Sequence, residues 1–208
     1  MFQGVTEIEI LARLIALVPA FTFHEFAHAW VAYRLGDPTA KDLGRLTLNP
    51  LKHIDVFGML MVLTVGFGWA RPVPYNPDNL RNGRKDIALV AVAGPLANLL
   101  FATFLALVWR LLAPEGSDLW NLVVLSSIRL NVALLFFNLI PIAPLDGFKA
   151  VAGWAPSGLY EWWMRTARTG PYVLMGLIGL SYLAPQLDIF GRLVLAPTLA
   201  LTALLIGV

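Results

Sequence analysis

The 208-residue sequence contains no cysteine and only three histidines. Without cysteine the chain can form no disulfide bond and can offer no thiolate ligand to a metal ion. Charged residues are also scarce: they make up 13% of the chain, whereas about a quarter of the residues of a soluble domain are charged. Apolar residues make up 58%, and the mean hydropathy is +0.72. These values exclude a soluble globular domain and predict an integral membrane protein.

The uncharged stretches of the sequence predict an all-α polytopic membrane fold with about five to six transmembrane or half-membrane helices. We expect helices over residues 8–35, 87–109, 119–140, 171–187 and 193–208. Residues 1–208 are expected to form one membrane domain, with a core over about 8–150 and the C-terminal helices over about 171–207. The N-terminal residues are acidic and lack a basic n-region, so a cleavable signal peptide is not expected.

The connections between these helices carry signals of their own. Residues 46–48 alternate weakly and suggest a short strand. Residues 56–70 are uncharged but number only 15, and a span needs about 20, so we expect a re-entrant or half-buried segment. Residues 71–77 contain three prolines and are expected to be extended. The tryptophan-rich stretch after Gly147 is interpreted as a loop at the membrane interface.

The first predicted helix contains the motif His24-Glu25-Phe26-Ala27-His28, which has the pattern HExxH. Positions four apart on a helix lie about 40° from each other around the axis, so both histidines point the same way, one turn apart. Two imidazoles in this arrangement can share a zinc ion. Glu25 is placed to accept a proton from water at the metal, the role of the glutamate in zinc peptidases.

Such a motif also arises by chance, but ionisable groups at membrane depth are expensive and usually functional. A catalytic zinc needs a third protein ligand. The metzincin pattern is excluded because Arg34 occupies the position where it requires a histidine. His53 is the remaining histidine. The carboxylates inside or beside apolar segments are Asp55, Asp86, Asp146 and Asp188.

Among these carboxylates Asp146 has the most unusual context. It follows an apolar helix that is broken by Pro141 and Pro144, and it precedes Gly147. Broken backbone at membrane depth is tolerated where it lines a cavity or packs on protein. The alternative is a solvated aspartate in an ordinary helix-terminating loop, and these residues alone leave both interpretations open.

Four stretches together resemble the site-2 protease family of intramembrane zinc metalloproteases, in its compact branch without a PDZ domain. The resemblance rests on HEFAH at residues 24–28, NPLKHID at 49–55 with Gly58, GPLAN at 94–98 and NLIPIAPLDG at 138–147, and it covers roughly residues 20–150. In that family the N-x-x-P-x-x-x-L-D-G segment supplies the third zinc ligand. The resemblance therefore implies one zinc per chain, held by His24, His28 and Asp146.

Three further polar residues are candidates for contact with the substrate or with the oxyanion formed during hydrolysis. His53 could donate to the oxyanion, but it could equally be a loop histidine bonded to the backbone. Asn98, close to Gly94 and Pro95, could hold substrate or link helices, and helix packing alone also explains it. Asn138 could satisfy backbone groups freed by the break in its helix or contact substrate.

The sequence thus predicts a zinc endopeptidase that cuts single-span membrane proteins within the bilayer. A catalytically inactive, partner-binding relative and a zinc or proton transporter are the alternatives. The retained Glu25 disfavours the first, and the clustering of ionisable groups at one level disfavours the second. No nucleic-acid partner is expected, since a net charge of +2 in a membrane protein reports topology.

Basic residues predict the orientation of the chain. If residues 56–70 do not cross, the segments on either side of them share one face, which the positive-inside rule makes cytoplasmic. We therefore expect a prokaryotic cell-membrane protein whose active site lies in the cytoplasmic half. The eight basic residues on this face are Arg34, Lys41, Arg45, Lys52, Arg71, Arg81, Arg84 and Lys85.

Overall fold

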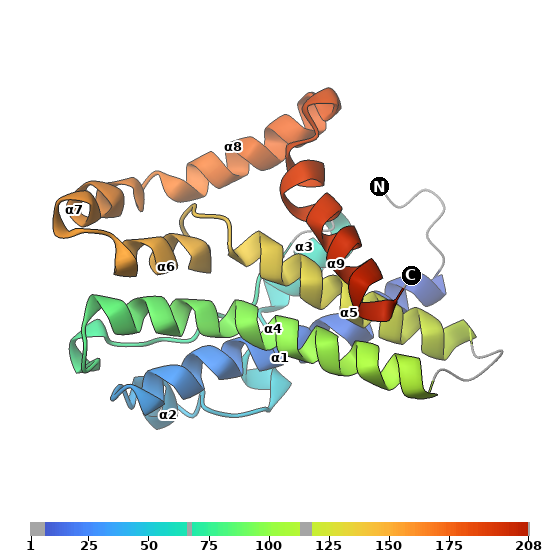
Figure 1. Cartoon of the computed structure of the whole chain (residues 1–208), viewed down its shortest axis with the longest axis horizontal. Coiled ribbons are helices and arrows are strands. Elements are labelled where there is room, and N and C mark those ends of the chain that lie inside the picture. Colours follow the sequence, from blue (N-terminus) through green and yellow to red (C-terminus); the bar gives the residue numbers. More distant parts are fainter. Residues whose placement is uncertain (1–6, 66–67, 113–117, 208) are drawn as a thin grey trace.

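Three long helices form the centre of the molecule in the computed structural model, which describes residues 7–65, 68–112 and 118–207 (Figure 1). They are α1 (Glu7–Arg34), α4 (Arg84–Leu112) and α5 (Asp118–Asn138), and each packs against the other two. A fourth helix, α9 (Ala196–Ile206), lies across α4 and α5. All regular structure within these described ranges is helical, as expected for an all-α fold.

Within the described residues, four helical segments are long and apolar enough to cross a membrane: residues 10–34, 84–112, 119–138 and 185–206. The last includes a π-helical turn, Gly191–Leu195, that leads into α9. Two further apolar helices are shorter, namely α3 (Val56–Val65) and α8 (Gly170–Leu183). Four long and two short apolar helices agree with the predicted mixture of full and half spans.

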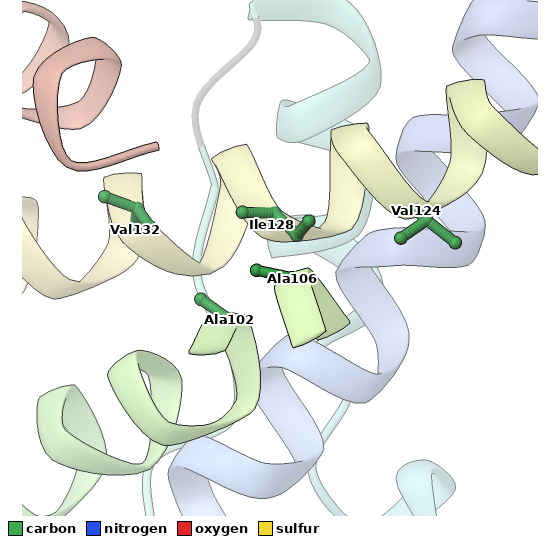
Figure 2. Close-up of a cluster of buried hydrophobic side chains, with 5 residues drawn as sticks. All are labelled: Ala102, Ala106, Val124, Ile128 and Val132. Atoms are coloured by element: carbon green, nitrogen blue, oxygen red, sulfur yellow. The ribbon is translucent and has the colours of Figure 1, made fainter. Parts of the chain in front are cut away.

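Small side chains allow the central helices to approach closely. Figure 2 shows Ala102 and Ala106 of α4 facing Val124, Ile128 and Val132 of α5, and all five are at least 95% buried. In a membrane, the lipid around a helix pair is as apolar as the interface between the two helices. Their association therefore depends on close packing rather than on the hydrophobic effect. Alanine opposite a branched side chain provides that packing.

The end of α1 and the start of α4 lie side by side. The backbone N–H of Arg81 donates to the carbonyl of Leu35 at 3.2 Å, so the chain between them leaves and returns at one end of the bundle. Within that stretch α3 has ten residues, which is about 15 Å of helix against a hydrocarbon core of about 30 Å. The prediction that residues 56–70 form no full span agrees with this geometry.

The predicted strand at residues 46–48 is wrong. Residues 46 and 47 form a bend, and the side chains of Thr47 and His53 make local hydrogen bonds there. The Thr47 carbonyl accepts from the His53 ring at 2.8 Å, and the Thr47 hydroxyl accepts from the Asn49 N–H at 3.2 Å. Side chains that bond locally in this way compete with a sheet ladder.

The interpretation of the tryptophan-rich stretch as a loop is also wrong, because it forms the two short helices α6 (Asp146–Trp154) and α7 (Ser157–Thr166). Short helices are marginal alone and depend on tertiary contacts. Gly153 of α6 lies directly against the backbone of Arg84 at the start of α4. The Trp163 indole N–H of α7 donates to the Phe148 carbonyl of α6 at 3.1 Å, and their rings stack at 5.4 Å.

Candidate metal centre

Two imidazole nitrogens from α1 and one carboxylate oxygen from α6 converge inside the bundle. The Nε2 atoms of His24 and His28 are 3.0 Å apart. Asp146 Oδ2 lies 3.1 Å from the first and 3.2 Å from the second. All three residues are buried, with at most 9% of each residue exposed. The structure thus brings together the His–His–Asp group that the sequence singled out.

The chain folds sharply to deliver Asp146 to this point. After α5 ends at Asn138, the backbone turns back so that Asp146 opens α6. At Gly147 a Cβ atom would overlap the backbone carbonyls of Leu139 and Ile140. The glycine therefore permits the close approach of α6 to the end of α5, and this approach sets the position of the neighbouring carboxylate.

Both histidines carry their proton on Nδ1. The Nδ1–H of His28 donates to the Val90 carbonyl at 2.7 Å, and a carbonyl can only accept. The Nδ1–H of His24 donates to Asn98 Oδ1 at 2.6 Å. The Asn98 amide must present its oxygen to His24 because its nitrogen donates to the Ala20 carbonyl at 3.1 Å. Both Nε2 atoms therefore point lone pairs at the same place.

This arrangement fits a zinc ion. Ligand atoms about 2.0–2.1 Å from a tetrahedral zinc ion are about 3.3 Å apart, close to the 3.0–3.2 Å separations found here. Two imidazole lone pairs and an ionised carboxylate in mutual contact repel one another unless a cation lies between them. Two imidazole nitrogens and a carboxylate oxygen that face one common point form a ligand set that zinc accepts.

Helix α4 leaves room for this group at Gly94. A Cβ atom at this position would collide with His28 Nε2 and with the His24 ring. The glycine in the middle of an apolar helix therefore has a steric reason, in addition to close helix packing. Together with Val90 and Asn98, which lie one turn before and one turn after it, Gly94 makes α4 the wall that supports both histidines.

Glu25 lies beside the His–His–Asp group and is held by an extended arm, residues 68–76. One carboxylate oxygen, Oε2, accepts from the Val73 backbone N–H at 3.0 Å. This contact leaves Oε1 as the oxygen that is free of the arm. Glu25 is 92% buried and lines the same cavity as the two histidines.

Loops on either side anchor the arm. The buried Arg45 guanidinium donates to the Arg71 carbonyl at 2.6 Å, and the Arg71 N–H donates to the His53 carbonyl at 2.8 Å. At the far end the Asn76 N–H donates to the buried Asp37 carboxylate at 2.7 Å. The arm is thus fixed both before and after Val73.

The charge on Asp37 is stabilised by its hydrogen bonds. Burial alone would raise the pKa of this carboxyl, but donors from Asn79, Thr39 and Asn76 outweigh that effect and hold the pKa below its usual range. Nearby on the arm, burial raises the pKa of the Tyr75 hydroxyl, and the negative charge of Asp146 adds to the shift. Tyr75 is therefore neutral, and Asp37 ionised, near neutral pH.

A cavity of about 680 Å³ opens from the His–His–Asp group. Its walls come from α1, the arm, the end of α5, α6 and α8, and they are mostly apolar. The Lys149 ammonium lines this space, 4.0 Å from Asp146 Oδ1. A mostly apolar cavity with a few convergent polar groups at one end is the usual form of a binding site.

The remaining predicted residues have different surroundings. Asn138 lines the cavity, and its amide donates to the Leu134 carbonyl at 3.0 Å. Asn98 contacts His24 instead of the cavity, and His53 is fully buried with its ring on the Thr47 backbone. Sequence reasoning missed Val73 and Val90, which act through main-chain atoms and leave no mark on residue type.

Comparison with known proteins gives relatives of one kind. The chain is 43% identical over 155 residues to a Bacillus subtilis protein named "Putative zinc metalloprotease YwhC", a match that covers 70% of each chain. It is 32% identical over 151 residues to "Putative zinc metalloprotease MJ0611" of Methanocaldococcus jannaschii, over 70% of this chain and 71% of that one. The match to "Putative zinc metalloprotease Rip2" of Mycolicibacterium smegmatis is 34% over 134 residues and spans about half of that relative, 51%.

No protein-family model and no solved structure matches the chain. The fold and the site define a polytopic helical membrane protein with a buried His–His–Asp group suited to a metal ion. With the likeness to YwhC and MJ0611, these features show that the chain belongs to the site-2 protease family of zinc metalloproteases.

Proposed function

We propose that this protein is a zinc-dependent endopeptidase that cuts membrane-protein substrates inside the bilayer. The observation that carries the proposal is the convergence of two Nε2 lone pairs and the Asp146 carboxylate at 3.0–3.2 Å, next to Glu25 and at the end of a large cavity. His24, His28 and Asp146 would hold one zinc ion, and Glu25 would be the catalytic residue.

Zinc held by these ligands would supply a Lewis acid that polarises the scissile carbonyl and acidifies water. Glu25 would accept the proton of the attacking water through Oε1 and return it to the amine that leaves. The Val73 N–H, by holding Oε2, limits the rotation of the carboxylate during both transfers. Asn98 and the Val90 carbonyl would keep the histidines in the tautomer that ligates.

The substrate proposed is a single-span membrane protein, cut in the cytoplasmic half of its helix. Each carbonyl of a transmembrane helix is hydrogen-bonded within the helix, so the segment must unwind before its peptide bonds can react. Pro72 and Val73 line the cavity in a segment that is not helical, and such a segment would suit an unwound strand better than a helix. Sites near Gly, Pro or Asn would be preferred because these residues weaken helices.

Asp146→Ala tests the ligand set. We expect purified wild-type protein to contain one zinc per chain and the variant to lose it, since two imidazoles alone leave a zinc site incomplete. Glu161→Gln, at an exposed position of α7, is the control and should retain zinc. Full retention of zinc by Asp146→Ala would exclude Asp146 as a ligand.

A further inference from the structure

A chain of buried amides extends from His24 to α5. The Asn98 nitrogen donates to two acceptors, the Ala20 carbonyl at 3.1 Å and Asn131 Oδ1 at 2.8 Å. The Asn131 nitrogen in turn donates to the Ser127 carbonyl at 2.8 Å. Asn98 and Asn131 are both 0% exposed, so water cannot replace any of these partners.

Each amide in this chain has one possible orientation. A flipped Asn131 would set its oxygen against the Ser127 carbonyl and its nitrogen against the Asn98 nitrogen. A flipped Asn98 would set its oxygen against the Ala20 carbonyl and offer a donor to His24 Nδ1. In that second state the His24 proton would move to Nε2, where it would block the lone pair that faces Asp146.

The two histidines therefore differ in what orients them. His28 is held by a main-chain carbonyl, Val90, which cannot flip independently of its helix. His24 is held by a side-chain amide, whose orientation depends on the groups around it. The Ala20 carbonyl accepts one hydrogen of the Asn98 nitrogen and Asn131 Oδ1 accepts the other, so each of them opposes the flipped amide.

We propose that Asn131 is a positioning residue for the metal centre: acting through Asn98, it holds the proton of His24 on Nδ1 and keeps Nε2 available as a ligand. The proposal rests on the proposed zinc site but not on proteolysis. It assigns a role to an asparagine that touches neither the histidines nor the cavity. Helix packing alone would account for a buried asparagine in α5 but requires no fixed orientation of its amide.

Zinc affinity in a double-mutant cycle tests this role. The full chain, purified in detergent, is titrated with zinc against a competing chelator for wild type, Asn131→Leu, Asn98→Leu and the double variant. Leucine has the same branching at Cγ as asparagine but neither donates nor accepts a hydrogen bond. Loss of a group that orients a metal ligand weakens binding by about 10- to 100-fold, and we expect Asn131→Leu to weaken it by about 10-fold.

The cycle separates the proposed role from general destabilisation. If Asn131 acts through Asn98, adding Asn131→Leu to Asn98→Leu should not weaken zinc binding further. Ser127→Ala is the matched control: it removes a buried hydroxyl one turn away, which donates to the Val123 carbonyl, and it should leave zinc affinity unchanged. An unchanged affinity in Asn131→Leu, or an equal loss with and without Asn98, would overturn the proposal.

The tautomer of His24 can also be read without zinc. The chain has only three histidines, so ¹⁵N-labelled imidazole signals can be assigned by single substitutions. With both imidazoles neutral, metal-free wild type should carry the His24 proton on Nδ1. Asn131→Leu should show a mixture of the two His24 tautomers and leave the His28 signal unchanged. A His24 signal that is identical in wild type and Asn131→Leu would overturn the proposed role of Asn131, even if zinc binding and proteolysis are both demonstrated. Absence of proteolysis with this shift present would overturn only the proposed function.

Discussion

At the scale of single residues, the candidate metal centre depends on glycines that leave space for other atoms, as well as on the side chains that could bind the metal. Gly94 is the clearest case, since its missing side chain is where the two imidazoles lie. Gly147 is a second, because it lets α6 begin against the end of α5. Neither glycine needs an unusual backbone angle. Both are required by the close approach of other atoms.

Gly94→Ala should therefore abolish metal binding without weakening the helix. Alanine in a helix interior is favoured over glycine by about 1 kcal/mol, so α4 itself should not be destabilised. The added Cβ would displace the His28 and His24 rings, and zinc content after purification should fall severely. Gly176→Ala in α8 is the control, because in the described part of the chain its added Cβ would meet nothing within 4 Å beyond its chain neighbours and its own helix backbone. Equal zinc in both variants would contradict the proposed geometry.

The residue scale also shows what sequence could and could not predict about the site. The i, i+4 spacing predicted the histidine pair, while the broken helix only drew attention to Asp146, and the family resemblance of residues 138–147 implied it as the third ligand. The Asn98–His24 contact was not predicted, because GPLAN at residues 94–98 is equally well explained by helix packing. His53 was an open choice, and the structure places its ring on backbone. Main-chain partners such as the Val73 N–H carry no signal in residue type.

At the scale of elements, the arm at residues 68–76 joins Glu25, the proposed catalytic residue, to the surrounding loops. Pro72 and Pro74 flank Val73 and keep the arm extended. Arg45 and Asp37 fix its two ends. The position of the Glu25 carboxylate thus depends on residues that are distant in sequence.

Val73→Pro should lower the rate of cleavage and leave zinc content unchanged. Proline fits an extended segment but has no N–H to donate to Glu25 Oε2. A hydrogen bond to a charged group contributes about 1.5–3 kcal/mol, so kcat should fall by about 10- to 100-fold. Val73→Ala keeps the N–H and should remain close to wild type. If both variants are equally impaired, the side chain of Val73 and not its N–H is what matters.

The short elements were the ones that the sequence predicted wrongly. Helices α6 and α7 have nine and ten residues, so they depend on tertiary contacts. Gly153 of α6 packs against the start of α4, and Trp163 of α7 contacts Phe148 of α6. The weak alternation at residues 46–48 predicts a strand. In the structure the Thr47 carbonyl bonds to the His53 ring, and the Thr47 hydroxyl accepts from the Asn49 N–H. The long helices needed no such contacts to be predicted, since length and hydropathy determine them.

At the scale of the whole molecule, the metal centre requires a particular order of membrane crossings. The Leu35–Arg81 backbone contact shows that α1 ends where α4 begins. Helices α4 and α5 are each long and apolar enough to cross once, and two such crossings would bring the end of α5 and Asp146 back to the end of α1 that bears the histidines. A further full crossing between α1 and α4 would separate His28 from Asp146.

Cysteine labelling tests this order, and the absence of native cysteine makes the signal specific. Asp42→Cys, at the end of the short helix α2 (Thr39–Asp42) that follows α1, is expected to react with an impermeant reagent from the cytoplasmic side, where the basic residues are predicted to lie. Ser117→Cys, at a position outside the described residues, is expected to react from the opposite side. Labelling of Ser117→Cys from the cytoplasmic side alone would contradict the topology.

The central claim is that a zinc ion at His24, His28 and Asp146 works with Glu25 to cut a membrane-embedded peptide bond. The most direct measurement is cleavage of a single-span substrate, co-expressed or reconstituted with wild type and with Glu25→Gln, together with zinc content. Glutamine keeps the shape of the side chain but cannot accept the proton. Because general acid–base groups contribute about 10²- to 10⁴-fold, Glu25→Gln should retain its zinc and lose cleavage by at least about 100-fold. Cleavage at the wild-type rate by Glu25→Gln would contradict the account.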